Sequence, residues 1–285
     1  MLSSSLLLGT LCACDTTGGT PSATSAPTPA PLKFAGENTG LTRDGTPKKY
    51  FILNFDDGIT QDKRIIEILK KYNATATFNI NTGLLGESWD WVADAVKVPG
   101  LTHKRFTEEE LRSGIYDGMD VDVHTLNHAN ILECSDETII NEVQKDADNI
   151  ADLFGYKPRG MAYAGGNFFD DHSVRVILEN TDVRFSRTIT SSNKFTLPKY
   201  WMKWNPTCHV NAGNVKSLAK KFINLKPETD SLFYVWGHGY ELDQLNSWDS
   251  FEELIKMISE ADDITILTSA EFYELFKDEI PCWED

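Results

Sequence analysis

Hydrophobic and polar residues alternate along most of this chain with the periods of strands and helices. Residues 50–55 (YFILNF) are nearly all apolar and precede two aspartates and a glycine, which predicts a strand buried on both faces that ends in a turn. Residues 61–72 repeat isoleucine and leucine at helical spacing after Thr60, a residue type that caps helices. Residues 74–80 (ATATFNI) alternate and are β-branched, so we expect a second strand.

The same alternation continues to the end of the chain. Further strands are expected at residues 119–124, 160–164, 183–188, 231–236 and 263–267, and further helices at 107–113, 135–154, 170–180, 214–225, 248–261 and 269–277. Strands that alternate with helices without an internal linker favour a single α/β domain. About seven or eight strands fit a distorted (β/α) barrel of mostly parallel strands better than a small open sheet.

The N-terminal residues do not share this alternation. Residues 1–13 are a short apolar run, too short to span a bilayer and similar to the end of a secretory signal. The sequence LCAC at residues 11–14 resembles a bacterial lipobox, in which Cys14 would carry the lipid. An irregular terminus without a targeting role is the alternative.

The next segment is rich in proline, serine and threonine. Residues 14–45 contain few large apolar side chains and predict a flexible tether. We therefore expect a signal segment at 1–13, a lipid-anchored tether at 14–45 and a folded domain at 46–285. This layout predicts an extracytoplasmic protein held on a lipid bilayer by its N-terminal acyl group.

The charge balance argues against two classes of partner, nucleic acids and anionic lipid surfaces, as far as binding by charge is concerned. The chain has 27 lysines and arginines against 43 aspartates and glutamates, a net charge of −16. Nucleic acids require a basic surface, and anionic lipids attract basic segments, so neither is expected to bind by charge. The chain has five cysteines, and no pair has the spacing of a structural zinc site.

Residues that can carry chemistry follow several of the predicted strands. Asp56 and Asp57 end the first strand, His124 ends the strand at 119–124, and His238 follows the strand at 231–236. In a parallel barrel these positions share one rim. His124 and His128 have a spacing that brings two imidazoles together, and two imidazoles with one carboxylate are typical of a catalytic zinc site.

Three motifs in this order resemble those of the polysaccharide deacetylases, carbohydrate esterases with a NodB-homology domain. Residues 54–58 (NFDDG) are similar to the family motif Thr-Phe-Asp-Asp-Gly, residues 124–128 (HTLNH) to His-Ser/Thr-x-x-His, and residues 236–238 (WGH) to the last motif. The resemblance covers about residues 46–277.

The resemblance implies roles for five residues. Asp57, His124 and His128 would bind a divalent metal, with Zn²⁺ as the default and Co²⁺ or Ni²⁺ as alternatives for the same ligands. Asp56 would be the general base, and His238 would protonate the leaving amine or alkoxide.

The third family motif, Arg-x-Pro-Tyr-Gly, is altered here to AYAGG at residues 162–166. Gly165 can still supply the backbone N–H that stabilises an oxyanion. The family arginine, which orients the base, would fall at Ala162. Arg187 ends a predicted strand on the same rim, so we expect it to hold Asp56 instead; an exposed arginine without a partner is the alternative.

The fourth family motif, an aspartate that tunes the acid histidine, is not visible in the sequence. Aromatic residues and a histidine occupy that region instead. Tyr163, Trp204 and His209 are our candidates for substrate contacts, and packing in the core is the alternative for the aromatic residues.

The resemblance implies a metal-dependent hydrolase that removes acetyl groups from an acetylated glycan, most of all one that contains N-acetylglucosamine. Two alternatives remain at this point. A catalytically inactive glycan-binding lipoprotein of the same fold is suggested by the altered motifs. A glycosidase with two carboxylates needs separated acids, whereas Asp56 and Asp57 are adjacent.

Overall fold

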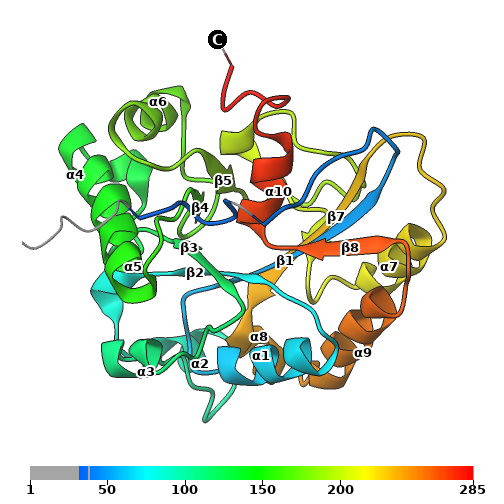
Figure 1. Cartoon of the computed structure of the whole chain (residues 1–285). Coiled ribbons are helices and arrows are strands. Elements are labelled where there is room, and N and C mark those ends of the chain that lie inside the picture. Colours follow the sequence, from blue (N-terminus) through cyan, green and yellow to red (C-terminus); the bar gives the residue numbers. More distant parts are fainter. Residues whose placement is uncertain (1–31, 38, 285) are drawn as a thin grey trace, which may run out of the picture. The chain divides into compact units, whose positions relative to one another are not determined.

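Eight parallel strands form one curved sheet in the part of the chain that the structure describes (Figure 1). The structure is a computed structural model that describes residues 32–37 and 39–284. The strands are β1 (Lys49–Asp56), β2 (Thr77–Ile80), β3 (Asp120–Val123), β4 (Gly160–Ala162), β5 (Phe185–Arg187), β6 (Cys208–His209), β7 (Ser231–His238) and β8 (Ile264–Leu267). Their order is β5-β4-β3-β2-β1-β7-β6, and β8 also pairs with β1. The predicted α/β class and distorted barrel are confirmed.

The two edges of the sheet are connected through the segment that contains β6. Arg187 of β5 forms a parallel bridge with Trp204, and β6 then pairs with β7. On the other side of the barrel, β1 pairs with β7 along its whole length, with β8 along its first half and with β2 along its second half. This sharing of β1 curls the sheet and makes the barrel irregular.

The helices follow the strands as predicted, with two additions. They are α1 (Asp62–Lys71), α2 (Trp91–Ala95), α3 (Glu108–Arg112), α4 (Asp136–Ile140), α5 (Asp146–Phe154), α6 (Asp171–Asn180), α7 (Val215–Ile223), α8 (Gly239–Gln244), α9 (Trp248–Ser259) and α10 (Ser269–Phe276). Short 3₁₀ turns occur at Thr82–Leu84, Ile131–Glu133 and Trp201–Lys203. The additions, α2 and α8, are only five and six residues long, too short to show a helical period.

Two helix predictions need correction. Thr60 does not cap α1, because the N-cap position is Gln61 and no side chain caps the helix there. The helix predicted at 135–154 contains the π-helical turn Asn141–Lys145 between α4 and α5. Its predicted ends are confirmed: Ser135 caps the first turn, and Gly155 ends the helix in a left-handed conformation.

The core has an outer and an inner layer, divided by the sheet. Along β1, Phe51, Leu53 and Phe55 belong to the outer layer, which also includes buried residues of α1, α5, α6, α7 and α9. Tyr50 and Ile52 belong to the inner layer, where α10 contributes its aromatic residues. Each fully buried side chain of this size contributes about 1.5–3 kcal/mol.

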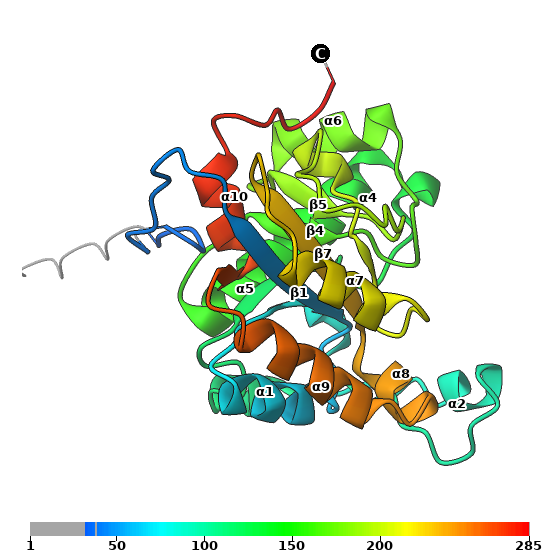
Figure 2. The same cartoon turned by 90° about the vertical axis from the view of Figure 1, so that its right-hand side faces the viewer.

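The inner layer changes from apolar to polar along β1. Tyr50, at the start of the strand, packs edge-on against Phe272 and Phe276 of α10, so α10 closes the amino end of the barrel. Because successive side chains alternate, Asn54 and Asp56 continue this inner face toward the other end. Figure 2 shows α10 beside one end of β1 and α2 and α8 beyond the other. The polar end of the barrel therefore contains the candidate site.

The chain divides into residues 1–31 and residues 32–285. The predicted signal segment and the lipidation site Cys14 lie outside the described residues. Residues 32–45, which the pattern assigned to the tether, include Ala35, which is buried in the inner layer. Within the described ranges, no helix is both long and apolar enough to cross a membrane.

Candidate active site

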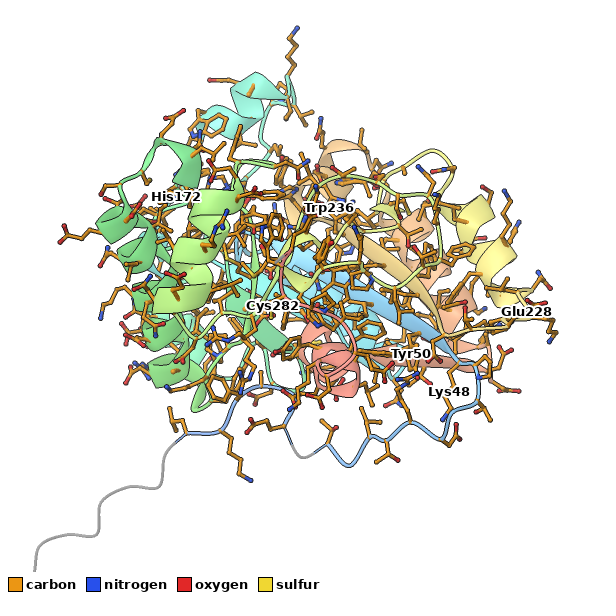
Figure 3. All side chains as sticks on the ribbon, turned by 90° about the horizontal axis from the view of Figure 1, so that it is seen from above. Lys48, Tyr50, His172, Glu228, Trp236 and Cys282 are labelled. Carbon is orange, nitrogen blue, oxygen red and sulfur yellow. The ribbon has the colours of Figure 1, made fainter. Side chains whose placement is uncertain are left out.

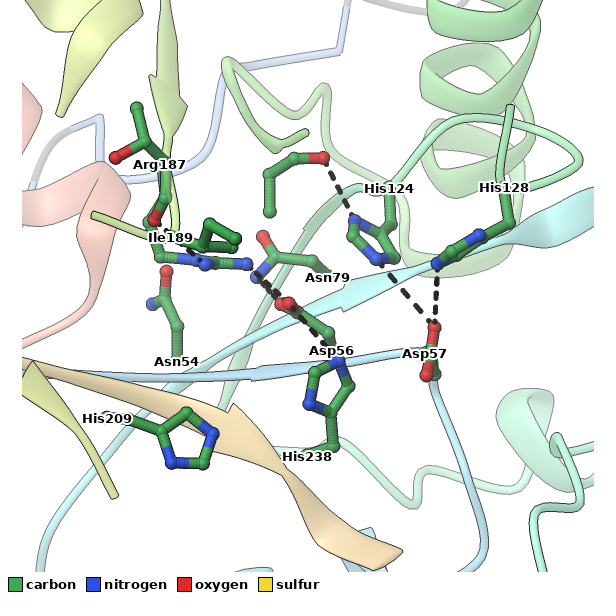
Figure 4. A network of polar contacts seen from close by, with 12 residues as sticks. Asn54, Asp56, Asp57, Asn79, His124, His128, Arg187, Ile189, His209 and His238 are labelled. Carbon is green, nitrogen blue, oxygen red and sulfur yellow. Dashed lines mark hydrogen bonds and ion pairs between the residues drawn. The ribbon is translucent and has the colours of Figure 1, made fainter. Parts of the chain in front are cut away.

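Asp56 is the last residue of β1 and is buried with both carboxylate oxygens in contact with partners (Figure 4). Asn79 of β2 donates to Oδ1 at 2.8 Å, and Arg187 of β5 donates to Oδ2. His238 Nε2, at the end of β7, lies 3.9 Å from the same Oδ2. Burial disfavours the charged carboxylate, but the charge of Arg187, together with those of His124 and His238, outweighs burial and lowers the pKa of Asp56. Asp56 is therefore an ionised carboxylate in a fixed orientation.

The predicted pairing of Arg187 with Asp56 is confirmed, and the register of the sheet explains it. Arg187 lies directly beside Ala162 on the neighbouring strand, which is the position where the family arginine was expected. The guanidinium thus reaches the same place from the next strand. It is buried, lies 4.3 Å from the ring centroid of Trp236 and donates from Nη1 to the Thr188 carbonyl at 3.1 Å.

Asp57, His124 and His128 lie together, as the sequence predicts. The ligand atoms of the three side chains are all within 4.8 Å of one another. His124 Nε2 is 3.7 Å and His128 Nε2 is 3.6 Å from Asp57 Oδ1. Figure 4 shows both imidazoles directed toward this carboxylate from the end of β3 and the loop after it.

The protonation of these groups fits a divalent cation. His124 Nδ1 donates to the Ala162 carbonyl at 2.9 Å, which leaves Nε2 as a lone pair directed toward Asp57. Burial lowers the pKa of His124, and it lowers the pKa of His128 to about 4, so both rings are neutral near pH 7. Asp57 Oδ1 is buried and accepts no hydrogen bond from any described residue. Two neutral imidazoles and one carboxylate oxygen are a donor set that could hold a divalent cation and match the three-ligand pattern of catalytic zinc sites.

The backbone of this site is strained. Asp57, Thr125 and His128 have φ angles of 79°, 62° and 57°, a left-handed conformation that non-glycine residues rarely adopt. Such strain persists where the surrounding structure imposes it and concentrates at functional sites. Successive side chains of a strand point to opposite faces. The turn at Asp57 interrupts this alternation, so that the carboxylates of two adjacent aspartates can belong to one site.

Two acidic residues of the π-helical region hold the loop that contains both histidines. Glu142 accepts from the Asn127 backbone N–H at 2.8 Å and from the Asn127 side-chain amide at 2.7 Å. Asp146 accepts from the His124 backbone N–H at 3.1 Å. The unusual turn therefore has a local function, since its side chains fix the loop in its left-handed conformation.

His238 is held by a carboxylate that the sequence analysis did not identify. Glu241, in the first turn of α8, lies 3.3 Å from His238 Nδ1 and 2.8 Å from His209 Nε2. Burial disfavours protonation of His238, but the nearby carboxylates, with Glu241 as the strongest and Asp57 and Asp56 next, outweigh burial and raise the pKa of His238 to about 9. Glu241 is thus an anionic partner of His238, of the kind that the missing fourth motif was expected to provide.

His209, the other histidine that contacts Glu241, acts as a hydrogen-bond donor in this structure rather than as a metal ligand. His209 Nδ1 accepts from the Asn211 backbone N–H at 3.2 Å. The proton of the His209 ring must then be on Nε2, which donates to Glu241. The ring is therefore held by Glu241, and the predicted contact of His209 with substrate stays a prediction.

A cavity of about 210 Å³ opens above these groups. Asp56, Asp57 and His238 lie at its polar floor, and Trp89, Trp91, Trp236 and Tyr240 form much of its aromatic wall. Gly165, as predicted, lines the same cavity. Its φ of 69° is one that glycine adopts without strain.

The structure separates the two aromatic candidates for substrate contact. Tyr163 lines the cavity, but its ring stacks on Phe169 and its hydroxyl donates to the Met202 carbonyl at 2.9 Å, away from the cavity. The prediction for Trp204 is wrong. Its indole is fully buried in the inner layer, where it packs against Phe272 of α10.

Sequence reasoning missed His103, which contacts the candidate metal site. His103 Nε2 lies 2.9 Å from Asp57 Oδ2, and the ring is buried. His103 follows no predicted strand and lies in a segment expected to be a loop. The only signals were that it is one of six histidines in the chain and that its loop contains two tryptophans, and neither identifies a partner for Asp57.

Comparisons with known proteins agree with this geometry. The family model for polysaccharide deacetylases matches residues 43–185, half of the chain. Poly-beta-1,6-N-acetyl-D-glucosamine N-deacetylases of Staphylococcus aureus strains are 28% identical over 166 residues, 54% of this chain and 54% of theirs. The chain thus spans about half the length of these curated relatives.

Solved structures share the fold. The Xyl-CE4 domain of a multidomain xylanase from the hindgut metagenome of Trinervitermes trinervoides has a TM-score of 0.52 and 15% identity, covering 83% of this chain and 95% of that domain. A family 4 acetyl xylan esterase from Clostridium thermocellum, in complex with a cobalt ion, has a TM-score of 0.50 and 15% identity, covering 82% and 94%. With the family model matched and the fold shared, the chain belongs to the polysaccharide deacetylase family.

Proposed function

We propose that this protein is a metal-dependent hydrolase that removes acetyl groups from an acetylated glycan, with N-acetylglucosamine units as the substrate class. One observation carries the proposal. A buried, ionised carboxylate (Asp56) lies beside a donor set for a divalent cation (Asp57, His124 and His128) on the floor of one cavity. A glycan-binding module without activity would need neither group.

Asp57, His124 and His128 would hold the ion, with Zn²⁺ as the first choice and Co²⁺ or Ni²⁺ as alternatives. When bound, the ion supplies a water of lowered pKa and polarises the acetyl carbonyl. The support for metal dependence is the unpartnered Oδ1 of Asp57 together with the free Nε2 lone pair of His124.

Asp56 would act as the general base. It is ionised, it lines the cavity, and its hydrogen bonds from Asn79 and Arg187 leave its orientation no freedom. A carboxylate fixed in this way can accept a proton from an attacking water without reorganising.

His238 would act as the general acid. Its Nδ1 faces Glu241 and its Nε2 faces the cavity floor near Asp56. With a pKa of about 9 the ring is protonated at neutral pH and can donate to a leaving amine. Gly165 would contribute its backbone N–H to the oxyanion that forms on the acetyl carbonyl.

The aromatic wall supports a sugar substrate. Trp91 is 60% exposed, an unusual exposure for so large an apolar side chain. Aromatic faces suit the apolar faces of sugar rings, and the relatives from Staphylococcus aureus are named for a polymer of N-acetylglucosamine. The cavity is too small for a polymer, so the chain of sugars would lie across its mouth.

The experiment is an acetate-release panel over poly-N-acetylglucosamine, peptidoglycan, chitin oligomers and acetylated xylan, with and without chelator. We expect acetate from an N-acetylglucosamine substrate, loss of release with chelator and recovery with Zn²⁺ or Co²⁺. Release of reducing ends instead of acetate would indicate a glycosidase. Binding of a glycan without any acetate release would indicate an inactive binding protein.

The extracytoplasmic, lipid-anchored location is also part of the proposal. It is supported by the LCAC sequence before the proline-rich segment. Mass spectrometry of protein expressed from the full-length gene in a bacterium should show an acylated Cys14 at the N-terminus. An unmodified Met1 terminus in the membrane-free fraction would contradict it.

A further inference from the structure

We propose that His103 is a positioning residue that presents Asp57 to the metal through a single oxygen. The inference rests on the proposed metal site. It adds a residue from outside the motifs that suggested the site and specifies how the carboxylate is held. It starts from the unequal surroundings of the two oxygens of Asp57.

The two oxygens of Asp57 differ in their hydrogen bonding. Oδ2 is 2.9 Å from His103 Nε2. Oδ1 is buried, accepts no hydrogen bond within the described part of the chain, and faces the Nε2 atoms of His124 and His128. A hydrogen bond on Oδ2 leaves Oδ1 as the oxygen available to a cation, so the carboxylate would bind through one atom.

The direction of the His103 hydrogen bond follows from its other nitrogen. His103 Nδ1 is buried and has no hydrogen-bond partner among the described residues. A buried N–H without a partner is costly, whereas a weak acceptor without one costs less. The ring proton is therefore on Nε2, where it donates to Asp57 Oδ2. A donor beyond the ligand atom is how metal sites orient their carboxylates.

The backbone around His103 is fixed by a short antiparallel pairing within the Trp89 loop, which we define as residues 82–106. Ser88 bridges Lys104, and the Trp89 backbone N–H donates to the His103 carbonyl at 2.8 Å. Ile59, just after the first motif, bridges Arg105. His103 is thus held against the turn that contains Asp57, although the two residues are far apart in sequence.

The indole of Trp89 fixes the His103 ring. The two rings stack with centroids 5.4 Å apart and an interplanar angle of 13°. The same indole contacts His128 edge-on at 5.1 Å, and Arg105 lies 3.9 Å from its centroid. Trp89 therefore packs against both the residue that orients Asp57 and one of the proposed ligands.

Arg105 explains why the orientation matters. Its Nη2 is 3.6 Å from Asp57 Oδ1 and donates to Asn81 Oδ1 at 3.3 Å, while its Nε and Nη1 are buried and have no hydrogen-bond partner among residues 32–37 and 39–284. A guanidinium binds a carboxylate best through two oxygens at once. Without the hydrogen bond from His103, Asp57 can rotate toward Arg105, and the oxygen that the cation needs is then taken by the arginine.

The test compares two substitutions at one position. His103→Gln keeps an N–H donor near Asp57, and His103→Leu removes it while filling similar volume. We expect His103→Leu to bind Zn²⁺ roughly 10- to 100-fold more weakly than the wild type, and His103→Gln to stay within about threefold of the wild type. Affinity is measured on dialysed protein by competition with a chromogenic chelator, without reference to turnover.

The control is His172→Leu, which removes an exposed histidine of α6 that pairs with Asp136. Figure 3 shows His172 at the outer side of the domain, away from the interior position of Trp236. Wild-type affinity in His103→Leu, or an affinity in His103→Gln as weak as in His103→Leu, would overturn the inference. If His103→Leu does not fold, the result for His103→Gln still decides. If the wild type retains no Zn²⁺, the proposed metal site fails, which is a different outcome.

Discussion

The two adjacent aspartates at the end of β1 have opposite surroundings. Asp56 has both oxygens occupied by permanent donors, Arg187 and Asn79. Asp57 has one oxygen bonded to His103, and its other oxygen has no hydrogen-bond donor among the residues that the structure describes. Neighbouring residues of the same type thus have surroundings that match their different proposed roles, Asp56 as a proton acceptor and Asp57 as a ligand of a cation.

The origin of the partners accounts for the difference. Asn79, Arg187 and His238 reach Asp56 from strands of the sheet, whose register fixes them. Asp57 is reached from loops, by His103 and His128, and its own backbone has already left the strand conformation. The sheet thus supplies the partners of Asp56, which we call the sheet side of the site, and loops supply those of Asp57, which we call the loop side.

The largest expected effect comes from removing a proposed ligand on the loop side. His124→Ala should leave the purified protein without retained metal and without detectable acetate release, because a two-ligand remainder rarely holds an ion. Metal content is measured by elemental analysis after Zn²⁺ loading and dialysis. Equal metal content in wild type and variant would contradict the assignment. His172→Ala, which changes an exposed histidine, should retain both.

On the sheet side, the expected effect is on turnover alone. Asp56→Asn keeps the shape of the side chain but cannot accept a proton, so kcat should fall roughly 100-fold or more. Metal content should stay at the wild-type level, since Asp56 lies outside the proposed ligand set. Asp136→Asn, an exposed site, is the control. A variant that turns over near the wild-type rate would remove Asp56 from the mechanism.

The same division explains what could be predicted from sequence. The sheet side was predictable because strand periodicity locates strand ends, and strand ends of a parallel barrel meet at one rim. Arg187 was found in this way, although its motif position holds Ala162. The barrel itself followed from the alternation of strands and helices.

The loop side was not predictable. His103 has no periodic signal, because its position depends on bridges within an irregular segment. Glu241 belongs to α8, a helix too short to show a hydrophobic period. Its contact with His209 joins α8 to β6, two elements that are separate in the sequence. Trp204 shows the opposite error, because it was predicted to contact substrate and is instead buried in the inner layer. In an irregular segment, the sequence does not distinguish an aromatic residue that lines a groove from one that packs inside the barrel.

Removing Arg187 tests whether an arginine on the neighbouring strand replaces the one that the altered third motif lacks. Arg187→Ala should lower kcat by roughly 10- to 100-fold through loss of orientation of Asp56 and leave metal content unchanged. Because it leaves a buried carboxylate without its cation, it should also cost about 3–5 kcal/mol of folding stability. Turnover is measured below the melting temperature of the variant.

Arg159→Ala is the matched control for that variant. Arg159 precedes β4 and lies near Glu37 and Glu274, at 3.6 and 3.8 Å. We expect its loss to leave kcat unchanged. An equal fall in both variants would mean that stability, rather than the orientation of Asp56, limits turnover.

The smallest expected effect, and the most specific, concerns Glu241. In the wild type its charge is the strongest of those that raise the pKa of His238 to about 9, against the effect of burial. A general acid must be protonated to act, so activity should be lost as pH rises through about 9. In Glu241→Gln the charge is gone and burial remains, which moves the pKa of His238 downward. The alkaline limb of kcat/KM should therefore shift to lower pH.

The pH dependence of the loss distinguishes two roles of Glu241: setting the pKa of His238 through its charge, and holding the His238 ring in place. At pH 8 we expect roughly tenfold or more loss of kcat/KM in Glu241→Gln, and at pH 6 a much smaller loss, because His238 is then protonated in both proteins. Activity should be measurable at pH 6, because the pKa of His128 lies at about 4 and this proposed ligand is therefore still neutral. Glu260→Gln, an exposed glutamate of a helix end, should keep the wild-type profile. A loss in Glu241→Gln that is equal at all pH values would show that Glu241 only places the His238 ring, and that its charge does not set the pKa of the acid.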